Sequence, residues 1–123
     1  MTRIFFIALA GALGTVTRYG LGNLVQRFAG SAYPWGTALV NVLGCLVFGV
    51  IWAMSERLVI RPDTRVILLT GFLGSFTTFS AFSFETVQLM RDAQWSWAAG
   101  NVIIQVLLGV AAIYLGLFTG RQL

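Results

Sequence analysis

Four long apolar stretches, separated by short polar loops, dominate this 123-residue chain. Each has about 18–24 residues, enough for an α-helix to cross a hydrocarbon core of about 30 Å. Lipid offers the backbone no hydrogen-bond partners, so spanning segments of this length are expected to be helical. The stretches run from Ile4 to Leu24, Thr37 to Met54, Val66 to Leu89 and Ala98 to Phe118. The sequence therefore predicts an all-α membrane protein with one four-helix transmembrane domain over residues 1–123.

The charged residues exclude several classes of protein. Only 10% of residues are charged, whereas soluble domains usually have about 25%. The eight basic residues are all arginines and lie scattered, while a nucleic-acid-binding protein clusters them on one face. Histidine is absent and Cys45 is the one cysteine, so neither an internal disulfide nor a Cys/His metal site is possible. With so few acid–base groups we do not expect an enzyme.

The first apolar stretch has two interpretations. Arg3 followed by an apolar run with Ala8 and Ala10 resembles a signal peptide. We favour a transmembrane helix because the apolar pattern continues to Leu24 and three more spans follow. Arg18 lies inside this stretch, and its side chain could either snorkel to the headgroups or line a water-filled anion vestibule.

Amide side chains occur in the second and fourth stretches. Asn41 lies about one turn into the second stretch, where it could form a helix–helix hydrogen bond or line a pore. In the fourth stretch, Asn101 and Gln105 are four residues apart and share one helix face. Because amides in lipid need partners, we expect Asn101 and Gln105 to complete a polar path.

The third stretch is expected to be a broken helix. Between Thr70 and Ser83 it contains Gly71, Gly74 and several hydroxyl side chains, and both residue types weaken a helix. Non-helical backbone at membrane depth occurs where protein or a watery cavity surrounds it. Such breaks are also where membrane proteins bind ions. We therefore place two half-helices on either side of residues 74–78.

Two ridges follow this break with helical spacing. One contains Phe79, Phe82 and Glu85, and the other contains Thr77, Ser80 and Ser83. The positive edge of a phenylalanine ring attracts anions weakly, and hydroxyl and amide hydrogens attract them more strongly. Together with Thr78 and Asn41, these groups could carry a small anion without binding it too tightly. Spacing alone also permits the rings simply to face the core or the lipid.

The run from Gly71 to Ser83, with Glu85 after it, resembles the signature of the Fluc/CrcB family of fluoride channels. Residues Pro34 to Thr37, which lead to Asn41, match as well, and the resemblance covers essentially the whole chain. It implies a fluoride-specific channel in the bacterial inner membrane that passively exports fluoride and lowers its cytoplasmic level. It also implies a dual-topology homodimer of antiparallel subunits.

The resemblance assigns roles to individual residues. Asn41, Phe79 and Phe82 match pore-lining positions. Gly74 and Thr77 match positions whose backbone carbonyls bind a structural, non-transported Na⁺ at the dimer centre. A further pair, Arg18 and Glu85, matches a vestibule arginine and a glutamate near a pore mouth.

Three features depart from the family pattern. Ser75 stands where a second glycine is usual, and Ala81 replaces a common threonine. The fourth stretch carries Asn101, Gln105 and Gly109 where some members have tyrosine and serine. The donors along the anion path are therefore expected to differ from those of such members.

Two other functions also suit a chain with four apolar stretches. A small multidrug antiporter needs a carboxylate in its first helix, which this chain lacks, and a structural membrane subunit would need no polar path.

Five arginines lie on the side of the termini and two or three on the other. This modest bias favours cytoplasmic termini by the positive-inside rule, but it is weak enough to agree with dual topology.

Overall fold

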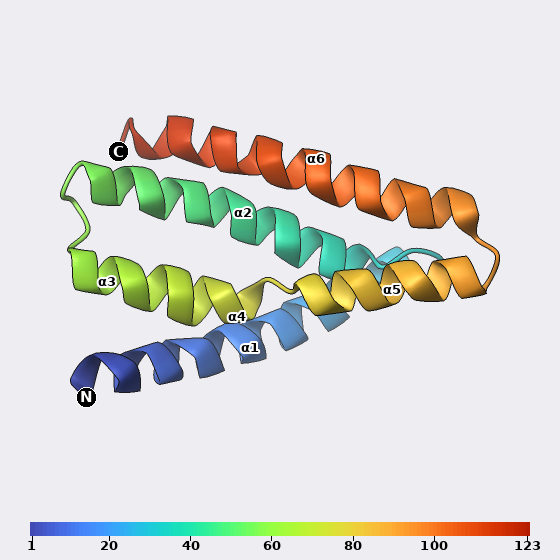
Figure 1. The fold of residues 1–123 in the computed structure, drawn as a ribbon, viewed down its shortest axis with the longest axis horizontal. Helices are drawn as coiled ribbons and strands as arrows, with labels where there is room; N and C mark the ends of the chain where they lie inside the picture. The colour runs from blue at the N-terminus through green and yellow to red at the C-terminus, as the bar shows by residue number, and fades with distance from the viewer.

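The computed structural model describes residues 1–123 and consists of helices joined by short connections, with no strands. Four helical segments are long and apolar enough to cross a membrane. They are α1 (Thr2–Ala29), α2 (Trp35–Glu56), a composite segment over Pro62–Arg91, and α6 (Trp95–Gly120). Figure 1 shows these segments side by side, with both termini at the same end of the molecule. The predicted all-α architecture with four spanning segments is confirmed.

The helices extend beyond the apolar stretches at both ends. The first helix continues past Leu24 to Ala29 and stops at Gly30, whose φ of 89° is readily adopted by glycine. Pro34 then precedes α2, and the loop between the two helices is correspondingly shorter than the gap between the apolar stretches that end at Leu24 and begin at Thr37. Composition marks where a helix can be buried in lipid, whereas its hydrogen bonds continue into the interfacial residues.

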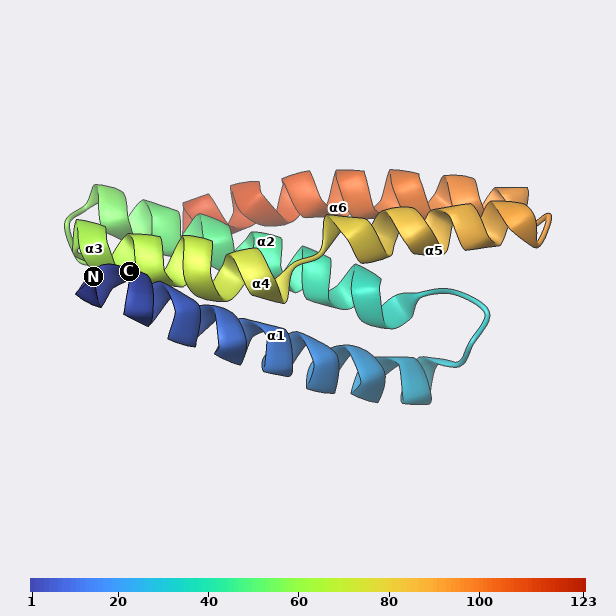
Figure 2. The same ribbon diagram turned by 60° about the horizontal axis from the view of Figure 1, so that its bottom comes forward.

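The third segment is built from several pieces (Figure 2). It begins with α3 (Pro62–Val66), continues as the π-helix η1 (Ile67–Leu73) and then as α4 (Gly74–Phe76). Thr77 and Thr78 are extended, with ψ angles of 156° and 114°, before α5 (Phe79–Arg91) begins. The interruption lies within the range that the sequence indicated and near the middle of the segment. The π-helix was not predicted.

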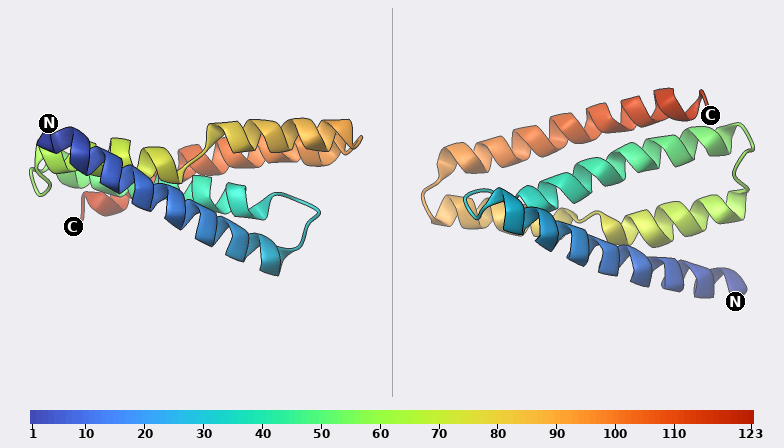
Figure 3. Two further views of the ribbon diagram at one scale, coloured as in Figure 1. Left: turned by 90° about the horizontal axis from the view of Figure 1, so that it is seen from below. Right: turned by 180° about the vertical axis from the view of Figure 1, so that it is seen from behind.

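The segments pack unequally (Figure 3). The second helix packs mainly along α6, whereas α1 packs on η1, α2 and α4 and diverges from α6. A small apolar core joins α2 to the first half of the third segment through Val40, Leu69, Leu73 and Phe76. Many large apolar side chains remain exposed outside this core, as expected for a surface that lipid or another subunit covers.

Candidate functional site

Asn41 on α2 binds the interrupted backbone directly. Its side-chain oxygen accepts a hydrogen bond from the Thr78 N–H at 2.7 Å, and its nitrogen donates to the Thr78 carbonyl at 3.1 Å. The amide therefore satisfies both backbone groups of a residue that has left the helix. Because an unpaired backbone group is costly away from water, this contact stabilises the interruption.

A chain of hydrogen bonds continues from Asn41 across α6 to α5. Asn41 donates to Gln105 at 2.8 Å, Gln105 donates to Asn101 at 2.8 Å, and Asn101 donates to Thr86 at 2.9 Å. The Thr86 hydroxyl ends the chain by donating to the Phe82 carbonyl at 2.7 Å. Four side chains from three helices thus form one continuous polar network, part of which the spacing of Asn101 and Gln105 had indicated.

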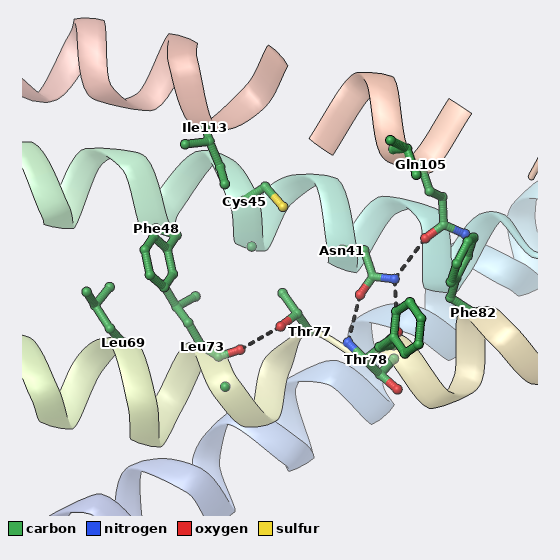
Figure 4. A pocket seen from close by; sticks show the side chains of 14 residues that line it. Asn41, Cys45, Phe48, Leu69, Leu73, Thr77, Thr78, Phe82, Gln105 and Ile113 are labelled. Carbon is green, nitrogen blue, oxygen red and sulfur yellow. Dashed lines mark hydrogen bonds between the residues drawn. The ribbon is translucent and has the colours of Figure 1, made fainter. Parts of the chain in front are cut away.

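A cavity of about 370 Å³ lies beside the interruption (Figure 4). Three phenylalanines, Phe48, Phe79 and Phe82, contribute rings to its wall. The ring centroids of Phe79 and Phe82 are 5.7 Å apart. Phe79 is 80% exposed in the single chain, whereas Phe82 is half-buried. The remaining wall is formed by Asn41, Gly44, Cys45, Leu69, Leu73, Gly74, Thr77, Thr78, Gln105, Val106 and Ile113. The cavity therefore combines aromatic rings, an otherwise apolar wall and two amides.

The interruption also leaves backbone carbonyls available at this cavity. The usual partner of the Gly74 carbonyl would be the Thr78 N–H, which instead donates to Asn41. The Thr77 carbonyl has no hydrogen-bond partner, and the Thr77 hydroxyl donates to Leu73 at 2.9 Å. Gly44 makes room for this arrangement, since a Cβ there would collide with the Thr77 methyl group.

A second cavity of about 260 Å³ opens between α1, α2 and the region around the interruption. Arg18, Glu85 and Thr37 lie in its wall, together with Gln26. Thr37 donates to one Glu85 carboxylate oxygen at 2.6 Å, while the other oxygen is buried without a partner. Arg18 does not extend toward the helix end, because its Nε donates to the Ser75 carbonyl at 3.0 Å.

Of the other residues predicted to line the fluoride path, Ser80, Ser83 and Asn101 lie outside both cavities, and the Thr78 hydroxyl caps a helix. The Thr78 hydroxyl caps α5 by accepting from the Ala81 N–H at 3.2 Å, and it lies 3.3 Å from the Ser80 hydroxyl. Ser80 is exposed and Ser83 is half-buried on α5, and neither lines the two cavities. Asn101 is fully buried behind Gln105, also outside both cavities.

Three polar residues around the site were given no role of their own by the sequence. Thr37 binds Glu85 and Thr86 ends the amide chain, as described above. Gln26 shapes the connection between α1 and α2 by bonding to the backbone of Gly30, Tyr33 and Gly36. Each is a polar residue in or beside an apolar stretch, and this position is the feature of the sequence that could have indicated a role.

Comparisons with known proteins identify the family to which this chain is similar. The family model described as "CrcB-like protein, Camphor Resistance (CrcB)" matches residues 5–117. A protein of Nitratidesulfovibrio vulgaris (strain Miyazaki F) named fluoride-specific ion channel FluC is 54% identical over 122 residues, which cover 98% of both chains. A protein of the same name from Nitrosococcus oceani is 52% identical over 98% of this chain and 97% of its own.

Proposed function

The chain belongs to the CrcB family of fluoride ion channels, which are not enzymes, and we propose that it conducts fluoride passively across the bacterial inner membrane. The observation that carries the proposal is the cavity in which the Phe79 and Phe82 rings and the amides of Asn41 and Gln105 form part of the wall beside an interrupted helix. Export follows if fluoride enters as neutral HF and ionises inside the cell.

The proposed fluoride path runs along the first cavity. Phe79 and Phe82 offer ring edges, and Asn41, Gln105 and Thr78 form the polar side of the same wall. Ser80 and Ser83 extend the path along α5, and Asn101 supports Gln105 from behind. Weak, distributed attraction suits conduction because each site must replace water and still release the ion. Arg18 and Glu85, which line the second cavity, are proposed to form the vestibule.

The carbonyls at the interruption are proposed to bind a structural Na⁺. The residues fit such an ion, since Gly74 and Thr77 both line the cavity, the Gly74 carbonyl lacks its usual helical partner and the Thr77 carbonyl is unpaired. Hard cations prefer oxygen ligands, and no acidic cluster is needed for carbonyl coordination. When bound, the ion would supply a fixed positive charge. Replacing all Na⁺ by a bulky organic cation should then lower fluoride flux, and flux indifferent to Na⁺ would contradict this site.

A second, antiparallel copy of the chain is proposed to complete the channel, with the interruption at the bilayer midplane. In support, Phe79 is largely exposed in the single chain although it lines the cavity, so the wall lacks a cover on that side. On a Cys45→Ala background, the cysteine of Leu123→Cys should react with an impermeant reagent from both sides of the membrane. Labelling from the cytoplasmic side alone would exclude dual topology.

Fluoride efflux from liposomes containing the purified protein tests the main proposal. Wild-type protein should release fluoride rapidly, whereas Phe79→Ile and Phe82→Ile should fold normally and conduct less because an aliphatic side chain has no positive edge. Phe118→Ile is the matched control, since Phe118 is 63% exposed on α6 and lines neither cavity. Unchanged efflux from both Phe79 and Phe82 variants would reject their proposed roles.

A further inference from the structure

The backbone of Thr78 fixes the orientation of the Asn41 amide. An amide can be turned so that its oxygen and nitrogen exchange places, and its partners decide between the two orientations. Here the Thr78 N–H can only donate and the Thr78 carbonyl can only accept. The Asn41 oxygen must therefore face the N–H, and its nitrogen must face the carbonyl.

This orientation determines every later bond of the chain. Because Asn41 presents its nitrogen to Gln105, the Gln105 oxygen must accept and its nitrogen must point toward Asn101. Asn101 accepts in turn and donates to Thr86, whose hydroxyl donates to the Phe82 carbonyl. Both ends of the chain are backbone groups of fixed polarity, so neither amide of α6 can be reversed without leaving two acceptors or two donors facing each other.

With the polarity fixed, the unused hydrogens can be identified. Both Asn41 amide hydrogens are engaged, one with Thr78 and one with Gln105. The Gln105 amide engages one of its two hydrogens, and so does the Asn101 amide. Of these two, only Gln105 lines the cavity, and Phe82 lines the same cavity.

We infer that Gln105 supplies the amide hydrogen that contacts the anion, whereas Asn41 is a positioning residue that orients Gln105 and holds the interruption. This inference rests on the proposed fluoride path and specifies its donor. The Thr77 hydroxyl does not compete for the role because it donates to Leu73. The ligand contacted is a small, hard anion that accepts one N–H hydrogen bond in the cavity that Phe79 and Phe82 also line.

The variant Gln105→Glu separates the free hydrogen from the rest of the chain. Burial in an apolar site favours the neutral carboxylic acid. That acid can accept from Asn41 and donate its single hydrogen to Asn101, which preserves the chain but leaves no hydrogen for the anion. Initial fluoride efflux should therefore fall about tenfold or more, the effect expected for losing one hydrogen bond to a charged partner. Efflux close to wild type in a normally folded variant would overturn the inference.

Asn101→Asp is the matched comparison. It makes the same amide-to-acid change at a member of the chain that lies outside the cavity. This variant should lose clearly less efflux than Gln105→Glu. An equal loss from both would mean that the intact network matters rather than the free Gln105 hydrogen, and would overturn the assignment.

A measurement on the wild-type channel avoids any dependence on folding of the variants. In isotope-labelled protein in lipid nanodiscs, fluoride titration should shift the side-chain N–H resonance of Gln105, and chloride should not. A fluoride-dependent shift confined to Asn41 would reverse the assignment. If wild-type liposomes release no fluoride at all, the proposed function itself fails, which is distinct from efflux that survives in Gln105→Glu.

Discussion

The two ends of the α2–α6 interface hold the same helices together in different ways. Toward the chain termini, Gly49 faces Gly116, and a Cβ at either position would collide with the backbone of the opposite helix. Gly120 approaches Val50 in the same manner. Toward the other end, Asn41 and Gln105 join the helices through a hydrogen bond of 2.8 Å. One end is therefore packed backbone to backbone, and the other is bridged by amides.

Close backbone packing sets the helix spacing at one end of the interface, whereas hydrogen-bonding side chains bridge the other end. Glycine contacts bring the helices close and exclude other groups, which is how small residues stabilise helix pairs in lipid. Amide contacts require slightly more room, but they provide donors and acceptors for the interrupted third segment. The closely packed end thus holds α2 and α6 together, and the other end presents polar groups to the interrupted third segment.

The largest effect is expected at the glycine end. Gly116→Leu forces a side chain into the α2 backbone around Leu46 and should destabilise the protein by about 3 kcal/mol or more. The yield of monodisperse protein and the thermal midpoint in detergent measure this. Gly100→Leu on the same helix is the control, because a Cβ at Gly100 meets nothing within 4 Å. Equal behaviour of the two variants would show that the close contact does not hold the helices together.

A smaller loss of stability, accompanied by loss of flux, is expected at the amide end. Asn41→Ala leaves both backbone groups of Thr78 without their partners and should cost about 1–3 kcal/mol. Fluoride efflux should fall as well, because Gln105 is no longer oriented. Unfolding curves and liposome efflux recorded on the same preparation test this. If the variant is less stable but keeps full efflux, the Asn41–Thr78 contact stabilises the fold without being needed for conduction, which would contradict the prediction.

The far end of the amide chain should be less sensitive. Thr86→Val keeps the shape of the side chain but removes the acceptor of Asn101, at a cost of about 1–2 kcal/mol. Efflux should decrease less than in Asn41→Ala, since Gln105 keeps both of its partners. A larger decrease than in Asn41→Ala would indicate that the chain is held from α5 rather than from Thr78.

The smallest effect is expected at Tyr33, whose ring packs beside Trp35 and Trp97 near the amide end. The Tyr33 hydroxyl is buried without a hydrogen-bond partner, so Tyr33→Phe should leave neutral-pH stability nearly unchanged. Burial, and then the charge of Glu85, raise the pKa of Tyr33 above its ordinary value. The neutral form is thus favoured by folding, and wild-type stability should decline as pH rises above about 10. Alkaline unfolding curves for the two proteins should therefore separate only in that range, and identical curves would contradict the prediction.

Much of the architecture could be predicted from the sequence because lipid imposes a simple rule. An apolar run of sufficient length becomes a helix, and hydroxyl residues with glycines mark where one is interrupted. The same logic placed Asn101 and Gln105 on one face, and the structure joins them by a hydrogen bond. Helix ends were less well predicted, since α1 continues through Gln26 to Ala29 after the apolar pattern stops.

What the sequence by itself determined is the set of spans, the place of the interruption and the kinds of side chain near it. Only the tertiary structure decided which partners these side chains have. Arg18 donates to the Ser75 carbonyl, and Asn41 pairs with Thr78 at the interruption of the third segment. Whether two groups form a hydrogen bond depends on differences of a few tenths of an ångström in the distance between segments that are far apart in the chain. Helical periodicity fixes only the face on which a residue lies, so it cannot determine those distances.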